Sequence, residues 1–335
     1  MNKIRFIKPL ALALAAALSC GLAQAQSSLN LGNYSVTATY ALDRLNGTNG
    51  GISGLEASGV TYAKDRNSLF FVGDEGTGVV EVSLTGQTLG YMNFNWSGTG
   101  STKHDTEGIT YLGNGQLVVG EERLFSAFKF SYANGGTAQL NNAGVNLGAP
   151  APNNDGMEGI SYDARNGGSF VAIKQYTPED IKAGTLSFGA GLSGTSTMST
   201  LFDPSKLGVA SLSDVAVLSG VDSFVGTTVA DHLLFLSLDS RKLVEADRSG
   251  NIISTFDLSN VVPHNGIEGV TIDEKGTIYL VAEQAQDGSE LASVAQSQLI
   301  ILSPTAAVPE PATATLMMIG ALSLLSLAKR RRQQR

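Results

Sequence analysis

The sequence predicts an all-β protein in which residues 27–303 fold as a single five-bladed β-propeller closed by an N-terminal strand. Three observations predict this fold. A short motif recurs five times, a second apolar run follows each copy after a turn, and a spare strand-like segment precedes the first copy. Because helical periodicity is scarce between the two ends of the chain, we expect β-strands throughout this region.

The five copies of the motif follow one another at intervals of 49, 51, 56 and 54 residues. Each copy begins near an acidic residue and continues as a short apolar run. The copies are residues 58–62, 107–111, 158–162, 214–218 and 268–272. Short runs separated by Gly-rich turns at this period are typical of four-stranded blades packed around an axis.

The last unit ends after its third predicted strand, residues 298–302, and so lacks a fourth. The unassigned segment 34–42 near the start of the chain can supply that strand. Such a closure joins the two ends of the ring and removes open sheet edges. A β-sandwich and a solenoid are the alternatives, but neither explains five copies together with a spare strand.

The first 25 residues have the three parts of a secretory signal peptide. Three basic residues precede an apolar run, and Ala23-Gln24-Ala25 forms a cleavage site before Gln26. A core helix is the alternative reading. The single cysteine, Cys20, lies in a poor lipobox, so a lipoprotein is disfavoured, and cleavage would leave no cysteine in the mature chain.

Residues 304–335 form a predicted linker and sorting signal. Pro309, Glu310 and Pro311 precede an apolar segment, 312–328, which is barely long enough to span a bilayer and is followed by a basic cluster. This arrangement resembles the PEP-CTERM sorting signal, whose Pro-Glu-Pro motif is processed by an exosortase in Gram-negative bacteria that produce exopolysaccharide. The resemblance implies a cell surface or matrix location after transient anchoring in the inner membrane; a permanent tail anchor is the alternative.

The region between the two ends is strongly acidic. It keeps 14 Lys and Arg against all 30 Asp and Glu, which places the mature body near −16. Such a surface repels nucleic acid and attracts cations.

The acids follow the repeat. An acid stands at the start of most first strands and at the end of most second strands, and antiparallel neighbours bring these positions together. Since the first strands line the channel of a propeller, both sets are expected at one mouth. The candidate ligands are Glu56, Glu75, Glu107, Glu122, Glu158, Asp214, Asp239, Glu268 and Glu283; Gln175 replaces the acid in the third unit.

Crowded carboxylates need either cations between them or protonation of some members. An oxygen-only ligand set favours a hard cation, and a wide flexible ring favours Ca²⁺ over Mg²⁺. The sequence therefore predicts bound calcium. The alternative is that these acids accept hydrogen bonds from the backbones of neighbouring blades, as some of them are expected to do.

The order of the short motifs resembles the SdiA-regulated family over roughly residues 35–303. Its members are exported five-bladed propellers, distantly similar to NHL-repeat propellers. The motifs run Glu-Ala-Ser-Gly-Val-Thr-Tyr, Asp-Glu, Glu-Gly-Ile, Glu-Glu-Arg, a second Glu-Gly-Ile, and Asp-His-Leu-Leu with Arg-Ser-Gly. The resemblance implies a propeller with calcium at a shared site, but it implies no reaction, because the family has no established biochemical activity.

Two functions are compatible with these observations. The first is a monomeric, exported, calcium-binding binding or scaffold module, whose partners would be an exosortase-type enzyme and an exopolysaccharide or a surface protein. The sequence contains no Gly-x-Ser-x-Gly elbow and no phosphate loop in a suitable context, either of which would favour an enzyme. The second is a calcium-dependent hydrolase of lactones, esters or phosphoesters, with His104 and His264 as candidate general bases near Glu107 and Glu268. A lone loop histidine is more often an ordinary surface residue, and His232 is interpreted as structural.

Overall fold

The computed structural model describes residues 28–42, 52, 56–151, 153, 155–175, 179–285 and 296–305. The predicted signal peptide, the Pro309-Glu310-Pro311 motif and the apolar segment 312–328 lie outside these residues. Within the described part of the chain, no helix is long and apolar enough to cross a membrane.

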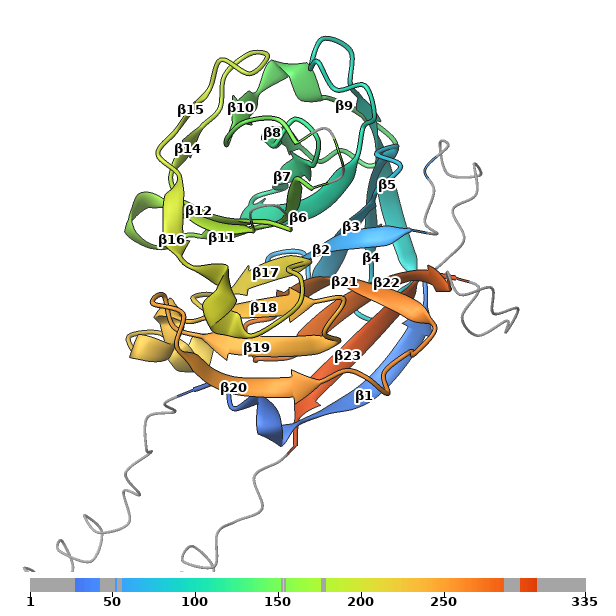
Figure 1. The fold of residues 1–335 in the computed structure, drawn as a ribbon. Coiled ribbons are helices and arrows are strands. Elements are labelled where there is room, and N and C mark those ends of the chain that lie inside the picture. The colour runs from blue at the N-terminus through green and yellow to red at the C-terminus, as the bar shows by residue number, and fades with distance from the viewer. Residues whose placement is uncertain are drawn as a thin grey trace, which may run out of the picture.

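The five-bladed propeller predicted from the repeat is confirmed (Figure 1). Five antiparallel sheets are arranged in a ring, in which the first strand of each sheet contacts the first strands of both neighbouring sheets. These inner strands are β2 (Ala57–Ala63), β6 (Thr106–Gly113), β11 (Met157–Asp163), β17 (Asp214–Val217) and β21 (Asn265–Ile272). Each contains one copy of the motif.

The outer strands of each blade follow in chain order. The second strands are β3 (Ser68–Gly73), β7 (Gln116–Glu121), β12 (Ser169–Lys174), β18 (Leu233–Ser237) and β22 (Ile278–Ala285). The third strands are β4 (Gly78–Val82), β8 (Ser126–Ser131), β13 (Asp180–Gly184), β19 (Lys242–Ala246) and β23 (Gln298–Pro304). The fourth strands of the first four blades are β5 (Thr88–Asn95), β10 (Gly144–Asn146), β16 (Ser199–Phe202) and β20 (Ile252–Asp257).

The predicted closure is also confirmed. Strand β1 (Tyr34–Ala41) pairs antiparallel with β23 and completes the fifth blade, so the blue and red ends of the propeller lie side by side in Figure 1. The remaining elements are additions to this plan. They are β9 (Thr137–Gln139), parallel to β5, the hairpin β14 (Leu186–Ser187) and β15 (Thr195–Ser196), and six short 3₁₀ helices: η1 (Leu31–Asn33), η2 (Leu140–Asn142), η3 (Arg165–Gly167), η4 (Pro204–Leu207), η5 (Asp222–Phe224) and η6 (Thr228–Asp231).

The core is divided into five hydrophobic clusters, one between each pair of neighbouring blades. Successive residues of a second strand serve different clusters because side chains alternate across a strand. On β3, Phe70 packs toward the second blade, whereas Leu69 and Phe71 pack toward the fifth. Every blade is therefore apolar on both faces, which explains why the second strands are continuous apolar runs.

The glycine after the acid in the motif is required by close packing around the axis. A Cβ on Gly108 would lie 2.9 Å from the Ile160 nitrogen of the next blade, and one on Gly269 would lie 2.6 Å from the Ser58 carbonyl oxygen. Both distances are shorter than a real Cβ contact. The repeated Glu-Gly pair thus combines a channel acid with the small residue that lets neighbouring blades approach.

Hydroxyl groups link the inner strands of neighbouring blades. The backbone N–H of Tyr111 donates to Thr61 Oγ1 of the preceding blade at 3.0 Å, and that of Tyr162 donates to Thr110 Oγ1 at 2.9 Å. Equivalent bonds run from Tyr62 to Thr271 and from Val217 to Ser161. The fourth blade has Ala216 at this position, so the junction of the fourth and fifth blades needs another acceptor.

Candidate acidic metal site

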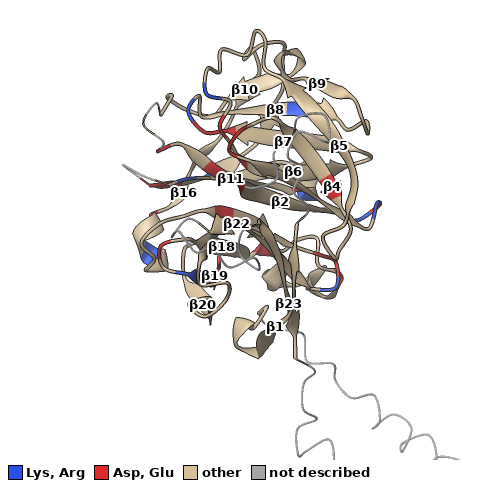
Figure 2. Ribbon diagram, turned by 90° about the vertical axis from the view of Figure 1, so that its right-hand side faces the viewer, with Lys and Arg blue, Asp and Glu red and all other residues tan. Residues whose placement is uncertain are grey.

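The acids at the strand ends are brought together at one end of the channel. The start of each inner strand pairs with the end of the second strand of its blade: Ala57 with Gly73, Thr106 with Glu121, and Met157 with Lys174. Carboxylates before or within the inner strand therefore lie beside those that follow the second strand. Figure 2 shows acidic segments on or beside β11 and β22 near the centre of the molecule.

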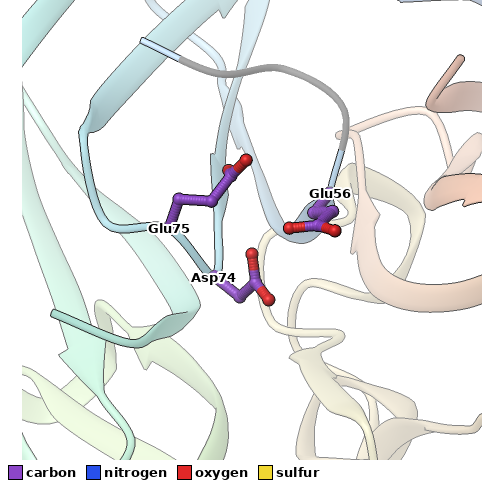
Figure 3. Close-up of side chains that lie close together, drawn as sticks. All are labelled: Glu56, Asp74 and Glu75. Atoms are coloured by element: carbon purple, nitrogen blue, oxygen red, sulfur yellow. The ribbon is translucent and has the colours of Figure 1, made fainter. Parts of the chain in front are cut away.

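The first group of carboxylates belongs to the first blade. One oxygen each of Glu56, Asp74 and Glu75 lies within 4.8 Å of the others. Figure 3 shows these side chains around a shared space, with Glu56 ahead of β2 and the other two after β3. Burial, a hydrogen bond with Glu56 and the charges of Glu56, Glu75 and Asp105 raise the pKa of Asp74 to about 8. Its buried Oδ1 has no hydrogen-bond partner in the part of the chain that the structure describes.

The second group belongs to the second blade and contains Asp105, Glu107 and Glu122, again with one oxygen of each within 4.8 Å of the others. Glu122 is fully buried (0% exposed); its Oε1 accepts a 3.0 Å bond from the Gly156 N–H, while its Oε2 has no hydrogen-bond partner among the residues that the structure describes. Burial, followed by the nearby Asp105 charge, raises the pKa of Glu122 to about 7 despite that bond. Arg123 Nε donates to Asp105 Oδ2 at 2.8 Å.

Three further acids, Glu158, Glu268 and Glu283, interact electrostatically with these groups or with one another. Burial and the charges of Glu122 and Glu268 hold the pKa of Glu158 well above its usual range. Burial and the charge of Glu283 raise the pKa of Glu268 to about 8. Burial and the charges of Glu158 and Glu268 likewise raise that of Glu107. We call this set the acid mouth: Glu56, Asp74, Glu75, Asp105, Glu107, Glu122, Glu158, Glu268 and Glu283.

The structure places two other sequence-predicted ligands differently. Asp214 is buried, and its two oxygens accept 2.7 Å bonds from the N–H groups of Val215 and Val270. It thus links the fourth blade to the fifth through Val270, two residues before the position that would face a hydroxyl at Ala216. Asp239 is exposed in the turn after β18. Neither residue belongs to the two three-carboxylate groups of the described chain.

Asp74 and Asp105 are members of these groups that the sequence reasoning missed. Asp105 precedes Glu107 by two residues, as Glu56 precedes Ser58, and residues two apart share a strand face. The two-residue spacing that identified Glu56 as a candidate ligand also applies to Asp105, so the sequence contained a signal for both residues. Asp74 adjoins Glu75, and the sequence offered no reason to prefer one over the other or to include both.

The two candidate general bases occupy different settings. The His104 ring stacks on Trp96, with ring centroids 5.3 Å apart and an interplanar angle of 5°, and its backbone is left-handed with φ 64°. His104 and Glu75 line the same open cavity of about 1140 Å³. His264 is half-buried ahead of β21. His232, interpreted as structural, is buried with its Nδ1 2.8 Å from Glu245 Oε1.

Two solved structures are similar to this chain at low sequence identity, and the first of them shares the propeller fold. Glutaminyl cyclase from Myxococcus xanthus matches with a TM-score of 0.50 and 11% identity, covering 81% of this chain and 96% of that one. A luciferin-regenerating enzyme matches with a TM-score of 0.44 and 11% identity, covering 79% and 95%. These likenesses concern the propeller and not its chemistry.

The family comparison is more specific, because it follows the order of the motifs along the chain. The family model described as SdiA-regulated matches residues 37–286, which include all five inner strands and all nine residues of the acid mouth. With the closed five-bladed ring, this match confirms the resemblance drawn from the motifs: the chain belongs to the SdiA-regulated family.

Proposed function

We propose that the acid mouth binds Ca²⁺ and that the protein is an exported calcium-binding propeller that serves as a binding or scaffold module. The observation that carries the calcium proposal is the Glu122 carboxylate: fully buried, with one oxygen unpartnered, and facing further acids. Such an arrangement is unfavourable unless the group is protonated or a cation completes it. Asp74 Oδ1 presents the same unmet acceptor in the first group.

The donor set fits a hard cation. All the ligand atoms are carboxylate oxygens, with no thiol and no imidazole in either three-carboxylate group. Calcium accepts six to eight oxygens in flexible geometry, whereas Mg²⁺ demands a near-ideal octahedron at shorter distances. Three carboxylates per group would hold the ion from one side, and the remaining positions would be open to Glu158, Glu268, water or a bound partner.

The binding role is supported by the chain as a whole. The two ends carry the patterns of an export signal and of a PEP-CTERM signal, which together favour delivery to the cell envelope, surface or matrix. On this proposal an exosortase-type enzyme processes the C-terminal end, and the mature monomer binds exopolysaccharide or a surface protein. The net negative body disfavours nucleic acid as a partner.

Calcium titration of the metal-free protein tests this proposal. We expect isothermal titration to detect Ca²⁺ binding that Glu122→Gln weakens at least tenfold and Mg²⁺ does not reproduce. Asp239→Asn is the matched control, because it removes an acid of the same repeat position that lies outside both groups. Equal affinity in wild type and Glu122→Gln, or an equal loss in Asp239→Asn, would refute the assignment.

A hydrolase is the second candidate, and one observation favours it. His104 is held against Trp96 in a cavity that it shares with Glu75. Calcium at the acid mouth would supply a Lewis acid for a carbonyl or phosphoryl oxygen, and the imidazole would be placed to accept a proton from water. Turnover of p-nitrophenyl acetate, a γ-lactone or p-nitrophenyl phosphate that requires Ca²⁺ and is abolished in His104→Gln would support it. Equal turnover in this variant would exclude His104 as the base.

A further inference from the structure

The end of the channel opposite the acid mouth contains a cavity of about 610 Å³. It is lined by the last residues of all five inner strands and by the turns that follow them. On β6, the acid mouth residue Glu107 and the cavity residue Tyr111 are four positions apart, or ~13 Å along a strand. The two sites are therefore separate, and this volume is that of a small-molecule site.

The walls of this cavity differ from blade to blade. The first three blades each place a half-buried tyrosine at the same repeat position, Tyr62, Tyr111 and Tyr162, whereas the other two place Val217 and Ile272 there. Two of the tyrosine rings each stack on a second aromatic ring. Tyr62 stacks on Tyr279 at an interplanar angle of 8°, and Tyr111 stacks on Phe70 at 18°. One side of the cavity is thus lined by tyrosines, and the other by aliphatic residues.

The charged side chains that line the cavity balance in sign. Lys64 pairs with Asp222 at 2.8 Å, and Arg165 pairs with Asp163 at 2.6 Å and with Asp231 at 2.7 Å. Asp65 and Glu274 also line the cavity, so its two basic and two acidic lining residues balance and favour neither an anion nor a cation. An uncharged ligand fits this balance best.

One acceptor in the cavity remains unused. Glu274 lines the cavity, and its Oε2 has no hydrogen-bond partner among the described residues. A hydrogen bond from Tyr62, together with Lys275 and Lys64, keeps the pKa of Glu274 below its usual value although burial opposes this, so the carboxylate is ionised at neutral pH. A wholly apolar ligand would exclude water from this ionised carboxylate without supplying a donor, which is costly.

We propose that this cavity binds a neutral saccharide unit. A pyranose ring has a face of C–H groups that can lie on the tyrosine rings and an edge of hydroxyls that can donate to the carboxylate of the lining residue Glu274. The volume of about 610 Å³ accommodates one or two such rings. This inference names the partner class of the binding role proposed above and rests on that role, but its site shares no residue with the acid mouth.

Saturation-transfer difference NMR on the intact protein tests the inference, with methyl glycosides of glucose, galactose, mannose and N-acetylglucosamine as probes. We expect transfer to the ring C–H protons of at least one glycoside, lost in Tyr162→Leu and reduced at least tenfold in affinity in Glu274→Gln. Tyr40→Leu, on outer strand β1, is the matched aromatic control. Melting temperatures establish that each variant is folded, and Glu274→Gln keeps the side-chain volume if Tyr162→Leu does not fold.

The outcomes separate this site from the calcium proposal. Binding that survives EDTA and Glu122→Gln supports the far cavity, whatever calcium does. Transfer with none of the four glycosides, or transfer unchanged in both cavity variants, overturns the saccharide assignment. Binding of choline or p-cresol in place of the glycosides overturns it as well, since either would show that the aromatic wall selects a cation or a flat aromatic ring.

Discussion

Glu122→Gln is expected to stabilise the metal-free protein at pH 8 and to weaken its response to calcium. Glu122 is fully buried, and burial together with Asp105 raises its pKa from the ordinary 4.5 to about 7. A carboxyl group whose pKa is raised by folding contributes its full stability below pH 4.5, and loses that contribution as the pH rises through 7. At pH 8 the ionised side chain therefore destabilises the metal-free fold.

The size of this effect follows from the same values. A pKa raised from 4.5 to about 7 corresponds to ~3 kcal/mol. For a domain of this size that free energy shifts Tm by roughly 5–10 °C. Glutamine imitates the protonated acid: it carries no charge beside Asp105 and Glu158, and its oxygen can keep the bond from the Gly156 N–H.

Thermal unfolding followed by circular dichroism in EDTA, at pH 5 and at pH 8, measures the effect. We expect Glu122→Gln to exceed the wild-type Tm at pH 8 and to match it within about 2 °C at pH 5, where the acid is already protonated. With excess Ca²⁺ the order should reverse at pH 8, because the variant has lost a ligand. A variant that is no more stable than wild type at pH 8, or equally more stable at both pH values, would refute the reasoning.

Three further predictions concern the packing of the blades. Asp214→Ala should lower the free energy of unfolding by ~2–3 kcal/mol equally with and without calcium, since two buried N–H groups lose their acceptor; a loss that calcium reverses in urea titrations would assign Asp214 to the metal instead. Gly108→Ala should cost at least ~2 kcal/mol through the 2.9 Å approach of its Cβ to the Ile160 nitrogen, and an unchanged Tm would contradict this. Thr61→Val should cost ~1 kcal/mol and speed amide exchange at Tyr111 while calcium affinity is kept; unaltered exchange would show that the hydroxyl is dispensable.

The fold could be predicted because its unit is repeated. Five copies of the motif, an incomplete last blade and the spare segment 34–42 together leave few ways to close a ring, and the β1–β23 pairing is the expected one. What the sequence could not supply is the contact between blades. Where Ala216 lacks the hydroxyl found at this position in other blades, the link to the fifth blade is a bond from the Val270 N–H to Asp214, which the sequence does not reveal.

The candidate site was predictable as a region but not residue by residue. Strand polarity alone places the acids of strand starts and strand ends at one mouth, which is where Glu107 and Glu122 lie together. Whether an equivalent acid turns into that space depends on local turns: Asp239 is exposed, whereas Asp74, beside Glu75, turns inward. The cavity lined by Tyr62, Tyr111 and Tyr162 was not predicted, because in the sequence these tyrosines look like ordinary residues of an alternating strand.

The most direct measurement of the central claim is the anomalous difference density of crystals grown with CaCl₂. Calcium at the acid mouth predicts a peak 2.3–2.6 Å from Glu122 Oε2, with oxygens of Asp105 and Glu107 in the same shell, and a second peak among Glu56, Asp74 and Glu75. Density absent from both groups at saturating calcium, with the carboxyl groups instead hydrogen-bonded to one another as protonated pairs, would contradict the calcium assignment.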